Sequence, residues 1–85
     1  MSWTLRVAHR AVKALKRAPA KDRQRLVVVL GEMQVDPFSG DVVRLQGELH
    51  TWRRRVGNYR VFFEISADQL TVDVLGIVRR TSTTY

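Results

Sequence analysis

The sequence predicts an α+β domain in which two N-terminal helices pack on one face of an antiparallel β-sheet, in the order β-α-α-β-β-β. Apolar residues recur at helical spacing between residues 8 and 34, and they alternate with polar residues from residue 52 onward. A loop rich in turn formers, residues 36–41, separates the two halves. Because such a sheet must bury its apolar face, the helices are expected to cover that face and leave the other open.

Length and composition limit the class of protein. A chain of 85 residues with 45% hydrophobic residues predicts one folded domain, residues 1–85. There is no cysteine, which excludes disulfides and thiolate metal sites, and we expect no metal or other cofactor. No apolar run reaches the roughly 18 residues of a membrane helix. Arg6, His9 and Arg10 interrupt any signal-peptide core, so we expect a cytoplasmic protein that binds no membrane.

The charge of the chain points to an acidic partner. Fifteen Lys and Arg residues against eight Asp and Glu residues give a formal net charge of +7 at pH 7. Such an excess attracts nucleic acid, a ribosome or an acidic protein, and it carries no information about the fold.

The N-terminal half is predicted as one strand and two helices. Residues 3–7 alternate apolar and polar side chains, whereas residues 8–17 have helical spacing. The first helix ends at Ala18, since the residue before a proline avoids the helical region. A second helix is predicted for residues 20–34. Its Gly31 costs about 1 kcal/mol relative to alanine, so packing on the sheet must hold this helix. The alternative, a basic membrane-binding helix, is disfavoured because the apolar stripe lacks aromatic residues.

A hairpin is predicted for residues 52–65, after a brief extended piece at residues 42–45. Glycine at the first central position of the Gly57-Asn58 turn suits a type II′ turn, which pairs Arg55 with Arg60. Alternation divides the side chains between two faces. The face expected to meet the helices carries Trp52, Arg54, Val56, Tyr59, Val61, Phe63 and Ile65. The opposite face carries Arg53, Arg55, Arg60, Phe62 and Glu64.

The opposite face is unusual because Arg55 and Arg60 are direct neighbours. Like charges facing each other across a strand pair are destabilising, and we expect a bound polyanion to relieve this repulsion. The planar fork of arginine donates two hydrogen bonds to one phosphate in fixed geometry. The alternative is a solvated sheet face whose long cations serve solubility.

The last strand is predicted for residues 70–78. With Ala67 and Asp68 as a two-residue loop, Ile65 pairs with Leu70 and the following positions continue in step. This register places Arg79 on the face of the other arginines and points Arg80 away, although a longer turn would shift it.

The chain resembles the RelE/ParE superfamily of toxins from bacterial type II toxin–antitoxin systems. The resemblance rests on Leu45-Gln46-Gly47 and on residues 52–63, Trp-Arg-Arg-Arg-Val-Gly-Asn-Tyr-Arg-Val-Phe-Phe, and it extends over essentially the whole chain. It implies a RelE-like microbial RNase fold. Arg54 departs from the family, which has an apolar residue there, and we expect it at the sheet edge or in a partner interface.

The resemblance implies two different activities. RelE-type members cut mRNA in the ribosomal A site by attack of a 2′-hydroxyl on the adjacent phosphate, without a metal, and leave a 2′,3′-cyclic phosphate. ParE-type members inhibit DNA gyrase. The dense arginine cluster and Tyr85 favour a ribosome-dependent endoribonuclease that inhibits translation; a ParE-like gyrase inhibitor is the alternative, and a passive RNA-binding module is a third possibility.

The roles of single residues follow from the same resemblance. By motif position, catalysis is assigned to Arg55, Arg60, Arg79 and Tyr85. RNA binding is assigned to Arg53, Arg55, Arg60 and Arg80. Arginine stays protonated, so Tyr85 is the expected general base, its phenolate favoured by nearby cations; the alternative is an ordinary C-terminal aromatic residue. Val78-Arg79-Arg80 stands where many members have Gly-His-Arg, which leaves His50 as a candidate acid.

The expected partners are the ribosome with its A-site mRNA and a cognate antitoxin, in a hetero-oligomer. We expect an acidic antitoxin segment to cover Arg53, Arg55, Arg60 and Arg79, or to displace Tyr85.

Overall fold

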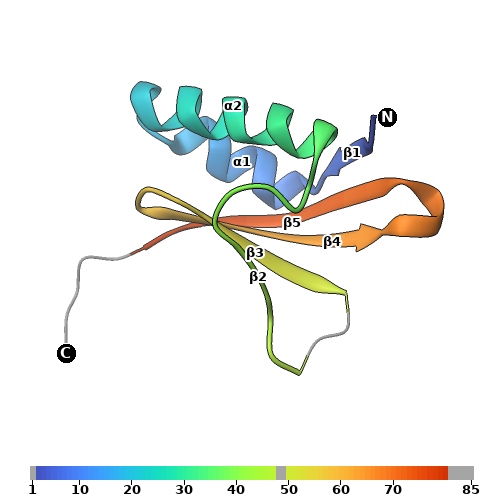
Figure 1. Cartoon of the computed structure of the whole chain (residues 1–85). Helices are drawn as coiled ribbons and strands as arrows, with labels where there is room; N and C mark the ends of the chain where they lie inside the picture. The colour runs from blue at the N-terminus through green and yellow to red at the C-terminus, as the bar shows by residue number, and fades with distance from the viewer. Residues whose placement is uncertain (1, 48–49, 81–85) are drawn as a thin grey trace.

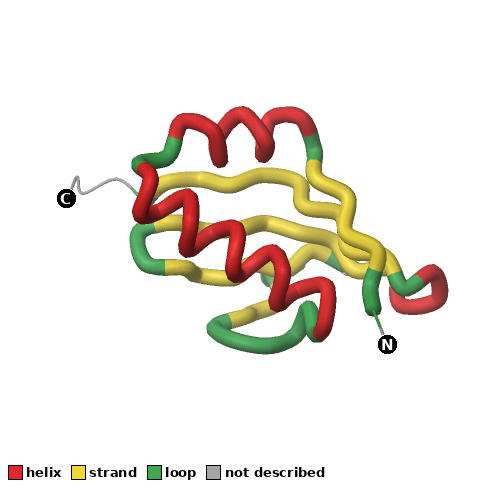
Figure 2. The backbone as a smooth tube through the Cα atoms, turned by 90° about the horizontal axis from the view of Figure 1, so that it is seen from above, coloured by secondary structure: helices red, strands yellow, loops and turns green. Residues whose placement is uncertain are grey.

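The computed structural model describes residues 2–47 and 50–80. The two helices lie side by side on one face of a five-stranded sheet (Figures 1 and 2). The elements in chain order are β1 (Thr4–Val7), α1 (His9–Arg17), α2 (Ala20–Val35), β2 (Val42–Arg44), β3 (Thr51–Val56), β4 (Tyr59–Ser66), the short 3-10 helix η1 (Ala67–Gln69) and β5 (Thr71–Arg79).

The predicted fold class is confirmed, with two differences in the sheet. The strand order is β1-β5-β4-β3-β2, and β1 runs parallel to β5, so the sheet is mixed and not wholly antiparallel. The piece predicted as extended, at residues 42–45, forms a fifth strand, β2, which pairs with β3. The two helices separate β1 from the rest of the sheet along the chain, and this long connection allows the parallel pairing.

The helices are held on the sheet by the apolar faces that they bury against it. Ala18 has the extended conformation expected before Pro19, and α2 begins directly after that proline. The side of α2 that faces the sheet carries its buried residues, Leu26, Val29, Leu30 and Met33. These side chains meet Phe63, Val61, Val72 and Val74 of the sheet in one core cluster. Burial of this stripe stabilises a helix that Gly31 alone would weaken.

The β3–β4 hairpin has the predicted register. Val56 pairs with Tyr59 and Arg55 with Arg60. Gly57 has a φ angle of +56°, whereas Asn58 keeps a negative φ, as a type II′ turn requires. The predicted inner face is also confirmed, because Val56, Tyr59, Val61, Phe63 and Ile65 are all buried there.

The predicted β4–β5 register is wrong. Ala67–Gln69 forms a helical turn and Leu70 adopts a left-handed conformation, with φ of 49°, so the connection uses more residues than a two-residue loop. Ile65 therefore pairs with Val72. A β-bulge between Phe62 and Phe63 then shifts the strands by one further residue. Beyond a bulge of this kind, each position of the longer strand points to the opposite face from the one predicted.

Candidate nucleic-acid interface

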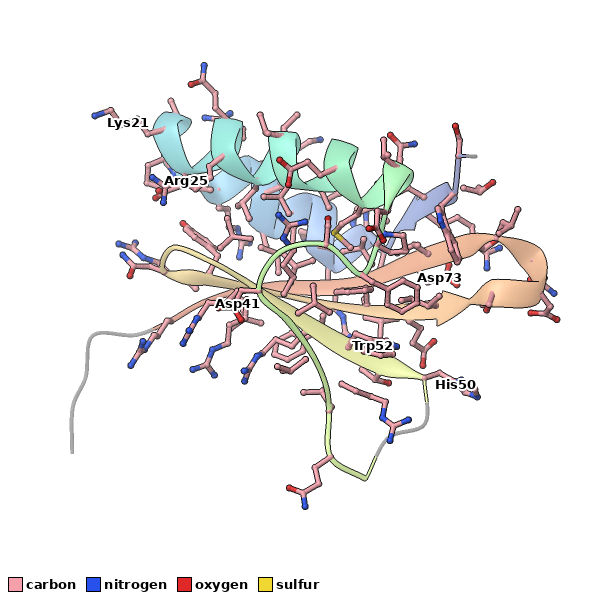
Figure 3. All side chains as sticks on the ribbon, viewed as in Figure 1. Lys21, Arg25, Asp41, His50, Trp52 and Asp73 are labelled. Atoms are coloured by element: carbon pink, nitrogen blue, oxygen red, sulfur yellow. The ribbon has the colours of Figure 1, made fainter. Side chains whose placement is uncertain are left out.

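The open face of the sheet is built from three rows of residues that lie opposite one another across β3, β4 and β5. Cross-strand partners share a face, so the pairing alone defines the rows. The basic row is Arg55, Arg60 and Val78. The middle row is Arg53, Phe62 and Gly76. The acidic row is Thr51, Glu64 and Asp73. Several side chains that end in nitrogen atoms project from this open side of the sheet near Asp41 (Figure 3).

Arg53 and Arg60 each have an Nε atom that is buried and lacks a hydrogen-bond partner within residues 2–47 and 50–80. Both residues are half-buried, on adjacent strands of the open face. A buried donor without an acceptor costs about 1–3 kcal/mol. If the two side chains turn toward an anionic oxygen between them, these donors become accessible and gain an acceptor, which makes this position a candidate phosphate site on the face.

Arg55 is partly neutralised by the chain itself. Its Nε donates to Asp41 Oδ2 at 3.0 Å, and both side chains are about half exposed, at 52% and 51%. Asp41 therefore relieves part of the repulsion between Arg55 and Arg60 before any polyanion binds. No local pattern predicts this role for Asp41, because the position of Asp41 depends on the pairing of residues 42–44 with β3. With Val42 opposite Arg54, the residue before Val42 falls beside Arg55.

The two arginines at the end of β5 do not lie as predicted. Arg79 pairs with Tyr59, whose side chain is buried under the helices, so Arg79 occupies a position on the helix side of the sheet. Arg80 follows it, and its backbone N–H donates to the Asn58 carbonyl. Because successive side chains of a strand point to opposite faces, Arg80 and not Arg79 lies on the same face as Arg60. The β-bulge causes this exchange. Tyr85 lies outside the described residues.

His50 lies at the wrong end of the sheet to act as an acid beside the arginines. Its backbone carbonyl accepts a hydrogen bond from the Ile65 N–H at 3.3 Å. Ile65 is five residues along β4 from Arg60, which corresponds to roughly 16 Å. The position of His50 therefore disfavours it as the candidate acid for a phosphate bound at Arg60.

Arg54 points to the helix side, as predicted, but it lies in neither a sheet edge nor an exposed interface. The side chain is buried, at 10% exposure, and its Nη2 atom donates to Glu32 Oε1 at 2.6 Å. Nη1 lies 3.5 Å from Ser39 Oγ. Arg54 thus joins β3 to α2 and to the loop before β2, and it takes no part in the open face.

The acidic row limits the cationic surface along the strands. Arg6 of β1 binds Asp73 through two hydrogen bonds, of 2.7 and 3.1 Å. The hydrogen bond and the carboxylate charge raise the pKa of the Arg6 guanidinium above its usual value. Glu64 lies next to this pair in the same row. Arg6 neutralises Asp73, so Glu64 is the carboxylate of this row that repels a polyanion, whereas the arginines of the basic and middle rows attract it.

The fold and the open face define a small α+β protein with an arginine-rich sheet surface, and comparison with known proteins identifies its family. The model of the family described as the ParE toxin of the type II toxin–antitoxin system parDE matches residues 5–83. Toxin RelE3 of Methanocaldococcus jannaschii is 32% identical over 63 residues, which cover 69% of this chain and 72% of that protein. The chain belongs to the RelE/ParE family of type II toxins, as its motifs predicted.

Solved structures agree on the fold. The archaeal RelE–RelB complex from Pyrococcus horikoshii OT3 matches with a TM-score of 0.84 and 23% identity, over 98% of this chain and 100% of that one. The isolated E. coli RelE toxin matches with a TM-score of 0.82 and 18% identity, over 96% and 88%. The RelB–RelE antitoxin–toxin complex from Methanococcus jannaschii has a TM-score of 0.74 and 27% identity, over 87% and 88%. Within the described residues, none of the helices is long and apolar enough to span a bilayer.

Proposed function

We propose that this type II toxin is a ribosome-dependent endoribonuclease that inhibits translation by cutting mRNA in the ribosomal A site. The observation that carries the proposal is the pair of buried Nε donors on Arg53 and Arg60, which lack an acceptor within the described chain and lie beside Arg55. A phosphodiester would supply acceptors to these donors once the two side chains turn toward it, and arginine donates to a phosphate in fixed geometry.

The proposed reaction needs a base, a proton for the leaving group and stabilisation of charge on phosphorus. The base takes the proton of the RNA 2′-hydroxyl as its oxygen attacks the adjacent phosphorus. The bond to the 5′-oxygen breaks, this oxygen takes a proton from water, and a 2′,3′-cyclic phosphate and a 5′-hydroxyl result. Arg60 and Arg55 stabilise the negative charge that develops on the phosphoryl oxygens. Motif position assigns Tyr85 as the base and Arg79 as a further cation. Because Arg79 lies on the helix side, its side chain would have to extend past the end of the sheet to contact the phosphate. No step is assigned to a metal.

An antitoxin is the proposed protein partner, since the Pyrococcus and Methanococcus relatives are complexes of RelE with RelB. A groove of about 490 Å³ lies between α2 and β3 and reaches Arg55. Val28 and Val56 contribute apolar surface to it, and Lys21 and Arg25 contribute positive charge. Glu32 and Asp41 also line the groove, and each is paired with an arginine. An acidic amphipathic segment fits this groove, and from there it can continue onto the arginines of the open face.

Mapping mRNA ends in cells that express the chain tests the proposal. We expect new ends inside translated reading frames, and we expect Arg60→Ala to abolish both these ends and the growth arrest. Arg6→Ala is the matched control, because it removes the same charge from the acidic end of the same sheet, where Arg6 is paired with Asp73. Thermal melting should show that both variants fold. Growth arrest with intact mRNA would reject the nuclease.

Inhibition of DNA gyrase is the second candidate, because the family model that matches the chain is described as a ParE toxin. This activity needs no catalytic site. It predicts DNA-damage signalling on expression and survival of cells that carry a resistant gyrase. Neither result is expected of an mRNA endonuclease.

A further inference from the structure

A hollow of about 420 Å³ lies on the sheet beside the arginines, and neither the phosphate contacts nor the proposed chemistry uses it. Its centre is the middle row, where Phe62 faces Gly76 across the strand pair. Because glycine has no side chain, the β5 side of the Phe62 ring is left uncovered. Thr51, Leu75 and Val78 line the rest of the depression.

Arg10 forms one rim of the hollow from a different element. Strand β1 ends at Val7, so beyond the Val7–Val74 pair β1 no longer supplies hydrogen-bond partners to the backbone of β5. Arg10, in the first turn of α1, donates from Nε to the Leu75 carbonyl at 2.7 Å. This bond fixes the position of the guanidinium and leaves its two terminal nitrogens as donors at the rim.

The charges around the hollow select its ligand. Arg53 lies opposite Phe62 on β3, about one strand spacing or roughly 5 Å away, and Arg60 lies two residues along β4. On the other side, Glu64 repels an anion, and Asp73 offers no attraction because Arg6 neutralises it. These charges favour a ligand with two parts. A flat or apolar part lies in the hollow, and a negatively charged group attached to it lies at Arg53 and Arg60.

We propose that the hollow is a nucleobase subsite, in which one base of the bound RNA stacks on Phe62 above Gly76 and presents its edge to Arg10. The proposal rests on the proposed function in so far as the ligand is RNA. Base–aromatic stacking tolerates any base, whereas the terminal donors of Arg10 favour a base edge that carries acceptors, such as guanine O6 and N7.

Gly76 provides a variant that tests the subsite without disturbing the strand. A Cβ atom at this position would meet only Arg10 Nε, at 3.9 Å, which is an ordinary van der Waals contact. Gly76→Val therefore occupies the space next to the Phe62 ring with three carbon atoms, and valine also suits a strand. Gly31→Ala is the matched control, since it adds a Cβ to an exposed glycine of α2 with nothing within 4 Å.

The experiment measures binding of the purified toxin to a short single-stranded RNA and to copies of it with one abasic nucleotide, placed at each position in turn. Wild type and Gly31→Ala should bind the copy with one particular abasic position about tenfold more weakly than the intact RNA. Gly76→Val should bind the intact RNA about tenfold more weakly than wild type does, and should not respond to that abasic position.

Three outcomes would overturn the subsite. Wild type could bind every abasic RNA like the intact one, Gly76→Val could lose the same factor on abasic as on intact RNA, or Gly76→Val could impair antitoxin binding alone, which would assign the hollow to the protein partner. Binding requires neither ribosome nor cleavage. A toxin that showed the abasic effect but left cellular mRNA intact would therefore reject the nuclease and keep the subsite.

Discussion

The guanidinium of Arg54 packs so closely on Gly40 that a Cβ atom at residue 40 would lie 2.7 Å from its Cζ atom. Gly40 has a φ angle of +82°, a backbone conformation that residues other than glycine rarely adopt. The same guanidinium binds Glu32. The buried arginine thereby fixes the loop that carries Asp41, and Asp41 in turn binds Arg55 of the open face.

Gly40→Ala should destabilise the protein more than Gly47→Ala does. Both glycines have a φ of +82°, so each alanine costs about 1–2 kcal/mol of backbone strain. Only at residue 40 does the new Cβ displace Arg54, and the loss of a hydrogen bond to a charged group adds about 1.5–3 kcal/mol. Urea unfolding of the two variants measures the difference. Equal losses would show that Arg54 moves aside without cost.

Asp41→Asn should strengthen RNA binding. The substitution frees Arg55 from a half-exposed ion pair, and a pair of this kind is worth about 0.2–1 kcal/mol, or up to about fivefold in affinity. Fluorescence anisotropy at low salt checks the increase. Asp68→Asn, in the turn at the other end of the sheet, removes the same charge and controls for net charge. If the two variants gain equally, the ion pair has no specific effect.

Arg80→Ala should weaken RNA binding more than Arg79→Ala does. The register gives Arg80 the face of Arg60 and puts Arg79 on the helix side. Loss of one phosphate contact should lower the slope of log affinity against log salt by about 0.7, the value for single strands. Titrations at several salt concentrations measure both slopes. A larger change for Arg79→Ala would mean that the bulge does not decide which arginine meets the phosphate.

Tyr85→Phe should abolish mRNA cleavage and leave RNA affinity nearly unchanged. The substitution removes only the phenolic oxygen, which the motif match assigns as the base, and general-base catalysis typically contributes about 10²–10⁴-fold. The rate of cleavage on programmed ribosomes and the affinity for RNA are measured on the same preparation. Cleavage at the wild-type rate would remove Tyr85 from the mechanism.

The sequence determined the elements of this protein whose signals are local. The period of the apolar residues identified both helices, and Gly57 with the alternation around it identified the hairpin and its register. The face of Arg53, Arg55 and Arg60 followed directly, because residues close to a two-residue turn have only one pairing open to them. The family motifs lie in the same stretch.

Tertiary structure decided everything that depends on pairing between distant segments. The bulge between Phe62 and Phe63 exchanged Arg79 for Arg80, and the helical turn at Ala67–Gln69 together with this bulge placed Gly76 opposite Phe62 in the hollow. The pairing of β2 with β3 brought Asp41 to Arg55. A change of one residue in strand register reverses which side chains share a face, and no local pattern fixes a register set by a turn and a bulge together.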